Sequence, residues 1–184
     1  MSANNGAKKK STEIKVLLIG DSYVGKTTLL LKYLQGEFIV NLDSTWRGVN
    51  LFRKMIESNG SEEGTNYYIN IWDIAGNRNY VDFFNLITQP MHAVIFVASS
   101  EDFDNLESSV YNWNELFKHI VHPSFSKFLI INKKSNESID TSNLVKVLQQ
   151  NNILKVFIVD PKISDQVKEA FEEIFEDILT TIKN

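Results

Sequence analysis

Residues 20–27, Gly20-Asp21-Ser22-Tyr23-Val24-Gly25-Lys26-Thr27, follow the pattern G-x-x-x-x-G-K-S/T, which can hold phosphate groups. A glycine-rich loop that enters a helix points successive backbone N–H groups at one spot, and the helix N-terminus adds partial positive charge. Lys26 would bridge the terminal phosphates and the Thr27 hydroxyl would bind Mg²⁺. The sequence predicts a phosphate site contacted by Gly20, Asp21, Ser22, Tyr23, Val24, Gly25, Lys26, Thr27 and Thr28.

A second segment offers residues of matching chemistry. The run from Tyr68 to Trp72 is typical of a strand, and it ends in Asp73. A carboxylate at a strand end is often only a turn residue, but beside a phosphate loop it can hold Mg²⁺ through water. Gly76 follows shortly after, and its N–H can be donated to a γ-phosphate. We expect Thr27 and Asp73 to share one metal.

These residues need particular elements around them, and the apolar pattern predicts such elements. The segment 14–19 is almost wholly apolar, as in a central strand covered on both faces, and 26–35 is typical of a helix. The segments 48–57 and 66–73 flank a polar loop and predict an antiparallel pair. Strands and helices then alternate: strands over 93–98, 128–131 and 156–159, helices over 106–120, 141–150 and 167–179. This alternation predicts one α/β domain with a mostly parallel sheet and helices on both faces.

The chain resembles the Ras superfamily of small GTPases, and its Rab branch best. Gly-Asp-Ser at 20–22 and Trp-Asp-x-Ala-Gly at 72–76 are Rab-like, and the resemblance runs from Glu13 to the C-terminus. It implies a three-layer P-loop G domain of six strands, one of them antiparallel, that binds GTP or GDP with Mg²⁺ in vesicle trafficking. It also implies that Thr45 binds Mg²⁺ and reads the γ-phosphate, and that Phe38 packs on the guanine. A core position is the other interpretation of Phe38.

The catalytic candidates that the resemblance implies are Lys26, Thr45 and Asn77. Most family members carry glutamine where this chain has Asn77, and that glutamine orients the attacking water. Asparagine is one methylene shorter, so we expect weak, slow GTP hydrolysis. Tyr23 replaces a small loop residue, and we expect it to point outward, with shielding of the phosphates as the alternative. Arg47 is either an arginine finger in cis or, as we favour, a solvated residue.

The base-binding motifs also depart from the family. Ser135 stands where an aspartate normally accepts two hydrogen bonds from guanine, and it offers one neutral oxygen. Glu137 or Asp140 could substitute for that aspartate. In the family a Ser-Ala-Lys loop contacts the guanine carbonyl through the alanine N–H, but the aligned Pro161 has no N–H. We expect reduced guanine specificity, with base-side contacts from Asn132, Lys133, Ser135 and Lys162.

Composition limits the remaining choices. The 184 residues are 43% hydrophobic and 23% charged with a net charge of −4, which excludes wholesale disorder and disfavours non-specific nucleic-acid binding. The chain has no cysteine, so it carries no disulfide and no cysteine-linked lipid anchor. We expect a flexible basic tail over 1–12 and one domain over 13–184. The expected protein is soluble and cytoplasmic, reaching membranes only through partners or a tail outside this sequence.

Three functions compete at this point. The first is a GTP/GDP switch whose regions 38–48 and 75–90 meet effectors, exchange factors and GTPase-activating proteins; Trp46, Phe83 and Phe84 would suit such a surface. The second is a pseudo-GTPase that serves as a protein-binding module without efficient hydrolysis. The third is a P-loop kinase using ATP, which the lack of an arginine-rich lid segment disfavours.

Overall fold

The computed structural model describes residues 11–34, 48–57, 65–77, 91–117, 125–134, 141–142 and 144–183. Along the chain, its elements are β1 (Ser11–Ile19), α1 (Lys26–Tyr33), β2 (Val49–Glu57), β3 (Asn66–Ile74), β4 (Ala93–Ser99), the 3₁₀ helix η2 (Ser100–Asn105), α3 (Leu106–Phe117), β5 (Ser126–Asn132), α4 (Leu144–Asn151), β6 (Lys155–Val159) and α5 (Ser164–Lys183). No helix within these described ranges is long and apolar enough to cross a bilayer.

The strands form one six-stranded sheet in the order β2-β3-β1-β4-β5-β6. Strand β2 is antiparallel to β3, with Val49 opposite Ile74 and Glu57 opposite Asn66, and every other neighbouring pair is parallel. The expected α/β fold, with a mostly parallel sheet and one antiparallel strand, is confirmed.

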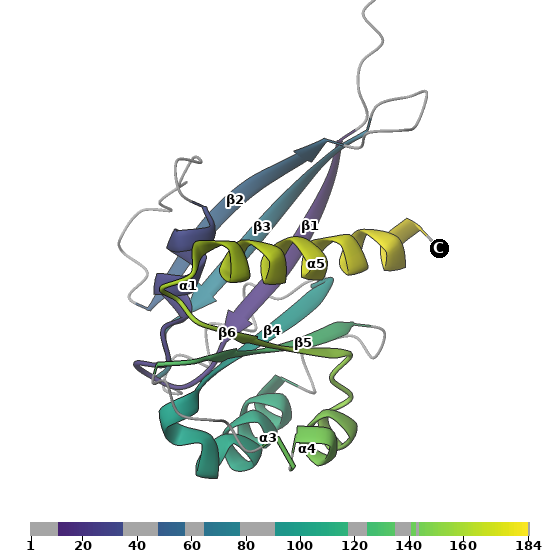
Figure 1. Cartoon of the computed structure of the whole chain (residues 1–184). Helices are drawn as coiled ribbons and strands as arrows, with labels where there is room; N and C mark the ends of the chain where they lie inside the picture. The colour runs from purple at the N-terminus through teal and green to yellow at the C-terminus, as the bar shows by residue number, and fades with distance from the viewer. Residues whose placement is uncertain are drawn as a thin grey trace, which may run out of the picture.

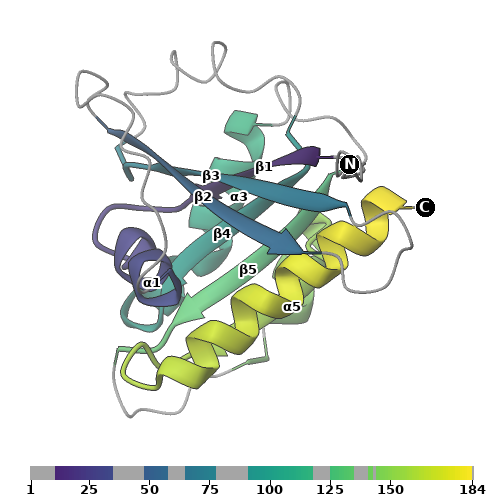
Figure 2. The same cartoon turned by 90° about the horizontal axis from the view of Figure 1, so that it is seen from above.

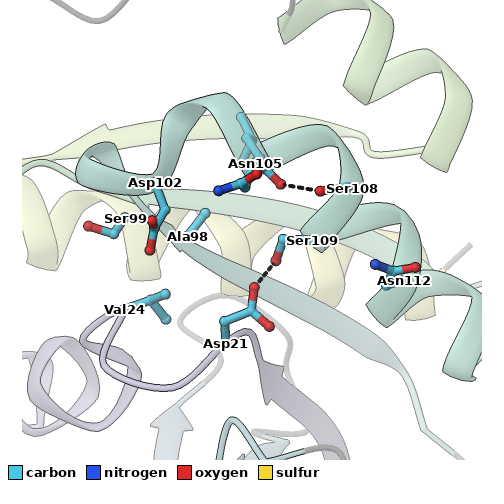
Figure 3. A pocket seen from close by; sticks show the side chains of 10 residues that line it. Asp21, Val24, Ala98, Ser99, Asp102, Asn105, Ser108, Ser109 and Asn112 are labelled. Atoms are coloured by element: carbon cyan, nitrogen blue, oxygen red, sulfur yellow. Dashed lines mark hydrogen bonds between the residues drawn. The ribbon is translucent and has the colours of Figure 1, made fainter.

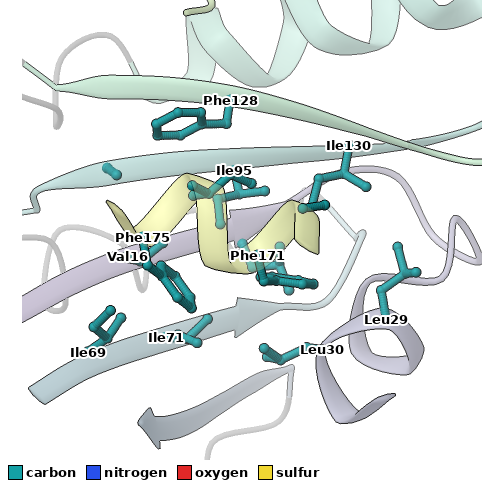
Figure 4. Close-up of a cluster of buried hydrophobic side chains, with 14 of the residues drawn as sticks. Val16, Leu29, Leu30, Ile69, Ile71, Ile95, Phe128, Ile130, Phe171 and Phe175 are labelled. Carbon is teal, nitrogen blue, oxygen red and sulfur yellow. The ribbon is translucent and has the colours of Figure 1, made fainter. Parts of the chain in front are cut away.

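Helices cover both faces of this sheet, as Figure 1 and Figure 2 show. Alternate residues of β1 point to opposite faces: Val16 packs toward α1 and α5, and Leu17 packs toward α3 and α4. Both layers are fully buried at β1, which explains why its sequence is almost continuously apolar. Figure 4 shows the α1–α5 side of the core, where Phe171 and Phe175 of α5 lie among strand and α1 side chains.

Several element boundaries differ from the sequence expectation. Strand β1 begins at Ser11, so the expectation of a tail through Thr12 is wrong by two residues: Ser11 and Thr12 pair with Asn66 and Tyr67 of β3. Ser11 and Thr12 are polar, so the apolar pattern does not include them in a strand. Their strand conformation depends on pairing with β3. Helix α5 also begins earlier than expected, at Ser164, and η2 was not expected.

The parallel register brings the carboxyl ends of the strands to one edge of the sheet. Leu18 lies opposite Asp73, Ser99 opposite Asn132, and Asn132 opposite Val159. Ligands of parallel α/β sheets bind at this edge, in the crevice beyond the strand ends. The loops after β1, β3, β5 and β6 therefore lie along this one edge of the sheet.

Candidate functional site

The loop between β1 and α1 takes the strained shape that a phosphate cradle needs. Gly25 lies at φ +92° as the residue before the first turn of α1, and Tyr23 has a φ of +65°. A methyl group on Gly25 would lie 2.2 Å from Nδ2 of Asn132, so the position requires glycine for space as well as for conformation. The side chain of Tyr23 is 94% exposed, which confirms that it points outward.

Lys26 is buried beneath this loop although it carries a charge. Its Nζ donates to the carbonyl oxygens of Gly20 at 3.0 Å and Asp21 at 2.7 Å. Burial lowers the pKa of Lys26, and the carboxylates of Asp73 and Asp21 oppose that shift. A buried, hydrogen-bonded cation at the start of a helix is suited to an anionic ligand in the loop above it.

Thr27 and Asp73 meet on the other side of the loop. The Thr27 hydroxyl donates to Oδ2 of Asp73 over 2.5 Å, while Oδ1 of Asp73 is buried without a hydrogen-bond partner among the described residues. Burial raises the pKa of Asp73, and the hydrogen bond from Thr27, the charge of Lys26 and the nearby side-chain amide of Asn50 lower it. An unsatisfied buried carboxylate oxygen beside a hydroxyl suits a hard cation such as Mg²⁺.

The donor set fits Mg²⁺ that arrives with a phosphate. Within the described ranges, no three His, Cys, Asp or Glu side chains gather into a metal site. Mg²⁺ is usually held by one or two protein oxygens together with substrate phosphates and water. Thr27 and Asp73 would therefore hold the ion, which would neutralise phosphate charge when bound.

The segment after β3 packs directly on the phosphate loop. A methyl group on Gly76 would lie 2.1 Å from the backbone nitrogen of Ser22 and 2.6 Å from the carbonyl oxygen of Asp21. Only glycine allows so close an approach between two backbones. Asn77 follows and is exposed, at the end of the described segment.

The end of β5 also contacts the phosphate loop. Asn132 is buried, and its Nδ2 donates to the carbonyl of Val24 at 2.9 Å. The ammonium group of Lys134 lies 3.0 Å from the carbonyl of Tyr23 and 3.1 Å from Glu101. The backbone N–H of Lys133 donates to the carbonyl of Val159, which joins this segment to the end of β6.

A carboxylate of the phosphate loop is held by helix α3, a contact that the sequence did not predict. Trp113 Nε1 donates to Oδ1 of Asp21 at 2.9 Å, and the Ser109 hydroxyl donates to Oδ2. Figure 3 shows Asp21 reaching toward Ser109 at one side of a cavity of about 260 Å³, which also involves Asp102 and Asn105. The only sequence signal at Trp113 is its place on the apolar face of its helix. That place indicates a core residue and does not predict a polar partner.

Of the predicted site residues, the structure brings together those of 20–28 with Asp73, Gly76, Asn132 and Lys133; Lys162 is exposed at the adjoining loop after β6. Other predictions fall outside the described residues, namely Phe38, Thr45 and Ser135, the alternatives Arg47, Glu137 and Asp140, and the expected partner surface with Trp46, Phe83 and Phe84.

Comparison with known proteins gives consistent results. The Ras family model matches residues 15–180. The chain is 32% identical to the Ras-related protein Rab-18-B of Danio rerio over 176 residues, which cover 92% of this chain and 81% of that protein. It is 26% identical to Rab-13 of Canis lupus familiaris over 168 residues, covering 90% and 79% of the two chains. A shorter match, 36% over 91 residues, covers 50% of this chain and 43% of the septum-promoting GTP-binding protein 1 of Schizosaccharomyces pombe.

Proposed function

This chain belongs to the Ras family of small GTP-binding switch proteins, with Rab proteins among its relatives, and we propose that it cycles between GTP and GDP with Mg²⁺. The single observation that carries this proposal is the contact between Thr27 and Asp73 beneath the phosphate loop. One hydroxyl and one buried carboxylate oxygen at that point form half of a metal site that a nucleotide phosphate would complete.

The roles of the individual residues follow from their positions. Lys26 supplies positive charge beneath the terminal phosphates, and the loop N–H groups orient them. Gly76 lies against Ser22, so movement of the segment after β3 would displace the phosphate loop. We propose that the nucleotide state reaches effectors, exchange factors and GTPase-activating proteins through regions 38–48 and 75–90.

Hydrolysis is proposed to be slow, because Asn77 offers a shorter side chain than glutamine for orienting water. Guanine is proposed to be recognised less sharply than in the family at large. Ser135 lacks the charged acceptor pair, and Pro161 lacks an N–H. A binding module without efficient hydrolysis is the second candidate. The short side chain of Asn77 and the weakened base contacts at Ser135 and Pro161 favour it.

Calorimetric titration with Mg²⁺–GTP tests the proposal. We expect Lys26→Ala to weaken binding strongly, because the buried cation is lost, and Thr27→Asn to weaken GTP more than GDP. Lys168→Ala is the matched control, since Lys168 is an exposed lysine of α5 that should leave binding unchanged. Equal affinity of wild type and Lys26→Ala would refute nucleotide binding at this loop. Tight binding with no phosphate release would favour the binding module.

A further inference from the structure

The loops after β5 and β6 form the wall of the site that lies away from Thr27 and Asp73. Asn132 and Lys134 contact the carbonyls of Val24 and Tyr23 in the phosphate loop, at 2.9 and 3.0 Å. The loop over 160–163 joins this wall, because the carbonyl of Pro161 accepts a hydrogen bond from Lys32 of α1. If phosphates occupy the loop and a metal occupies the Thr27 side, this wall is where the base of a nucleotide would lie.

Backbone donors are absent or already used throughout the described part of this wall. Pro161 has no N–H. The N–H of Lys162 donates to Oδ1 of Asp160 at 2.8 Å, and that of Ile163 donates to the Asp160 carbonyl at 2.9 Å. The N–H of Asp160 donates to the side chain of Gln166 at 2.9 Å.

The segment after β5 is equally occupied. The N–H of Lys133 donates to Val159 at 2.8 Å, and that of Lys134 donates to the Ser100 hydroxyl at 3.1 Å. A carbonyl on the base would therefore find no fixed backbone donor from residues 133–134 or 160–163. The ammonium groups of Lys133 and Lys162 end flexible stems, so they attract electronegative atoms without fixing which atom they meet.

The same wall carries a hydrogen-bond acceptor, the side chain of Asp160. The carboxylate of Asp160 uses Oδ1 for Lys162, and Oδ2 accepts no hydrogen bond from the described residues. Guanine carries a carbonyl oxygen at the ring position where adenine carries an amino group. A carboxylate accepts from an amino group and repels a carbonyl oxygen.

We propose that this site admits adenine nucleotides alongside guanine nucleotides, with Asp160 accepting a hydrogen bond from the exocyclic amino group of adenine. The proposal rests on the nucleotide binding proposed above and extends it to a second substrate class. Asp160 is then one of the residues that determine base preference, acting both through its free oxygen and by occupying the N–H of Lys162.

The test compares binding of Mg²⁺ complexes of GTP, ATP and diaminopurine riboside triphosphate to nucleotide-free protein by calorimetry. The diaminopurine keeps the second amino group of guanine but carries the amino group of adenine in place of the carbonyl. For wild type we expect ATP to bind within about tenfold of GTP, and the diaminopurine nucleotide at least as tightly as GTP.

Asp160→Asn is the informative variant, because its amide oxygen still accepts from Lys162 while its NH₂ group replaces an acceptor by a donor. We expect it to shift the GTP-to-ATP affinity ratio toward GTP by about tenfold or more, at an unchanged melting temperature. Asp165→Asn removes the same charge five residues later and should leave the ratio unchanged. Pro161→Ala, which adds a backbone N–H, should shift the ratio in the same direction and provides an independent route if Asp160→Asn fails to fold.

Each outcome has a definite meaning. Exclusion of ATP by about a thousandfold in wild type, or an unchanged ratio in both variants, overturns the role of Asp160 while leaving GTP binding in place. Failure of all three nucleotides to bind overturns the proposed function together with this inference. Equal shifts in Asp160→Asn and Asp165→Asn would show a general charge effect and also overturn it.

Discussion

At Gly76, the backbone after β3 lies against the peptide that joins Asp21 and Ser22. We expect Gly76→Ala to push these two segments apart, because the added methyl group would overlap backbone atoms at 2.1 to 2.6 Å. Overpacking of this kind costs about 1–3 kcal/mol. If this cost falls on the nucleotide-bound state, GTP affinity should drop by about 5- to 150-fold. Titration with Mg²⁺–GTP measures the loss, and circular dichroism checks the fold. Unchanged affinity would mean that the segment moves away from the loop when nucleotide binds.

Asn77 is exposed, and it is the last described residue of the segment that follows β3. We expect Asn77→Gln to speed GTP hydrolysis by about 10- to 100-fold, because the longer side chain would hold water nearer the γ-phosphate. Single-turnover phosphate release is the measurement, and Asn77→Ala, which should be no faster than wild type, is the control. An equal or lower rate in Asn77→Gln would show that another residue, such as Arg47, sets the rate.

Among the elements, α3 is coupled to the phosphate loop through the Asp21 carboxylate. Trp113→Phe keeps an aromatic ring in the core but removes the N–H that donates to Oδ1 of Asp21. A hydrogen bond to a charged group is worth about 1.5–3 kcal/mol, and partial exposure of Asp21 reduces this. We expect GTP to dissociate several-fold faster, with part of the effect lost in an Asp21→Asn background.

The matched control for this coupling is Phe117→Leu, which alters the same core from the same helix. Trp113 and Phe117 stack with centroids 6.2 Å apart, so both substitutions disturb one cluster. Phe117→Leu should lower the free energy of unfolding while leaving GTP dissociation unchanged. If both variants speed dissociation equally, core stability and not the hydrogen bond controls the loop.

The start of β4 is joined to β1 by a histidine. The backbone N–H of Lys15 donates to Nδ1 of the His92 ring at 3.0 Å, and the backbone N–H of His92 donates to the Lys15 carbonyl at 2.8 Å. Burial and the charge of Lys15 lower the pKa of His92. The unfolded chain then binds more protons in mild acid, so this contribution to stability is present above about pH 6.5 and is lost as the pH falls through the lowered folded value.

We expect His92→Asn to remove that pH dependence, because its amide oxygen accepts the same hydrogen bond and does not titrate. Urea unfolding at about pH 7.5 and about pH 5.5 should show wild type losing up to about 1 kcal/mol more than the variant. Identical losses in the two proteins would assign the acid sensitivity to other groups.

Elements with local causes were predictable from the sequence. The apolar run over 14–19, the loop over 20–27 and the carboxylate at Asp73 each carry their signal within a few residues. The Thr27–Asp73 contact followed from two such signals, because parallel strands end at one sheet edge.

Contacts set by tertiary register were not predictable. Trp113 has the apolar spacing of a core residue, and only the packing of α3 beside β1 brings its N–H to Asp21. The Asp160 carboxylate accepts a hydrogen bond from the N–H of Lys162, two residues later, in a local turn that neither hydropathy nor family motifs indicate. The start of β1 at Ser11 likewise depends on its partner strand.

At the scale of the whole molecule, the site lies at the end of strands that contribute side chains to both layers of the core. The phosphate loop continues from β1, which packs on both faces, while Asn132 and Asp73 extend from strands on either side. A ligand held by these loops would contact the ends of β1, β3 and β5 together. Nucleotide binding should therefore stabilise the whole domain and not merely the loop.

Thermal unfolding measures that stabilisation. With Mg²⁺–GTP at about 100 times its dissociation constant, a ligand that binds only the folded state adds about 2.7 kcal/mol. For a domain of this size, each kcal/mol raises the melting temperature by about 2–4 °C, so we expect a rise of about 5–11 °C. Lys26→Ala at the same nucleotide concentration should show little of this rise, because its buried cation is missing, whereas Lys168→Ala should match wild type. A full rise in Lys26→Ala would place the nucleotide elsewhere on the protein, and no rise in wild type would argue that the loop holds no nucleotide under these conditions.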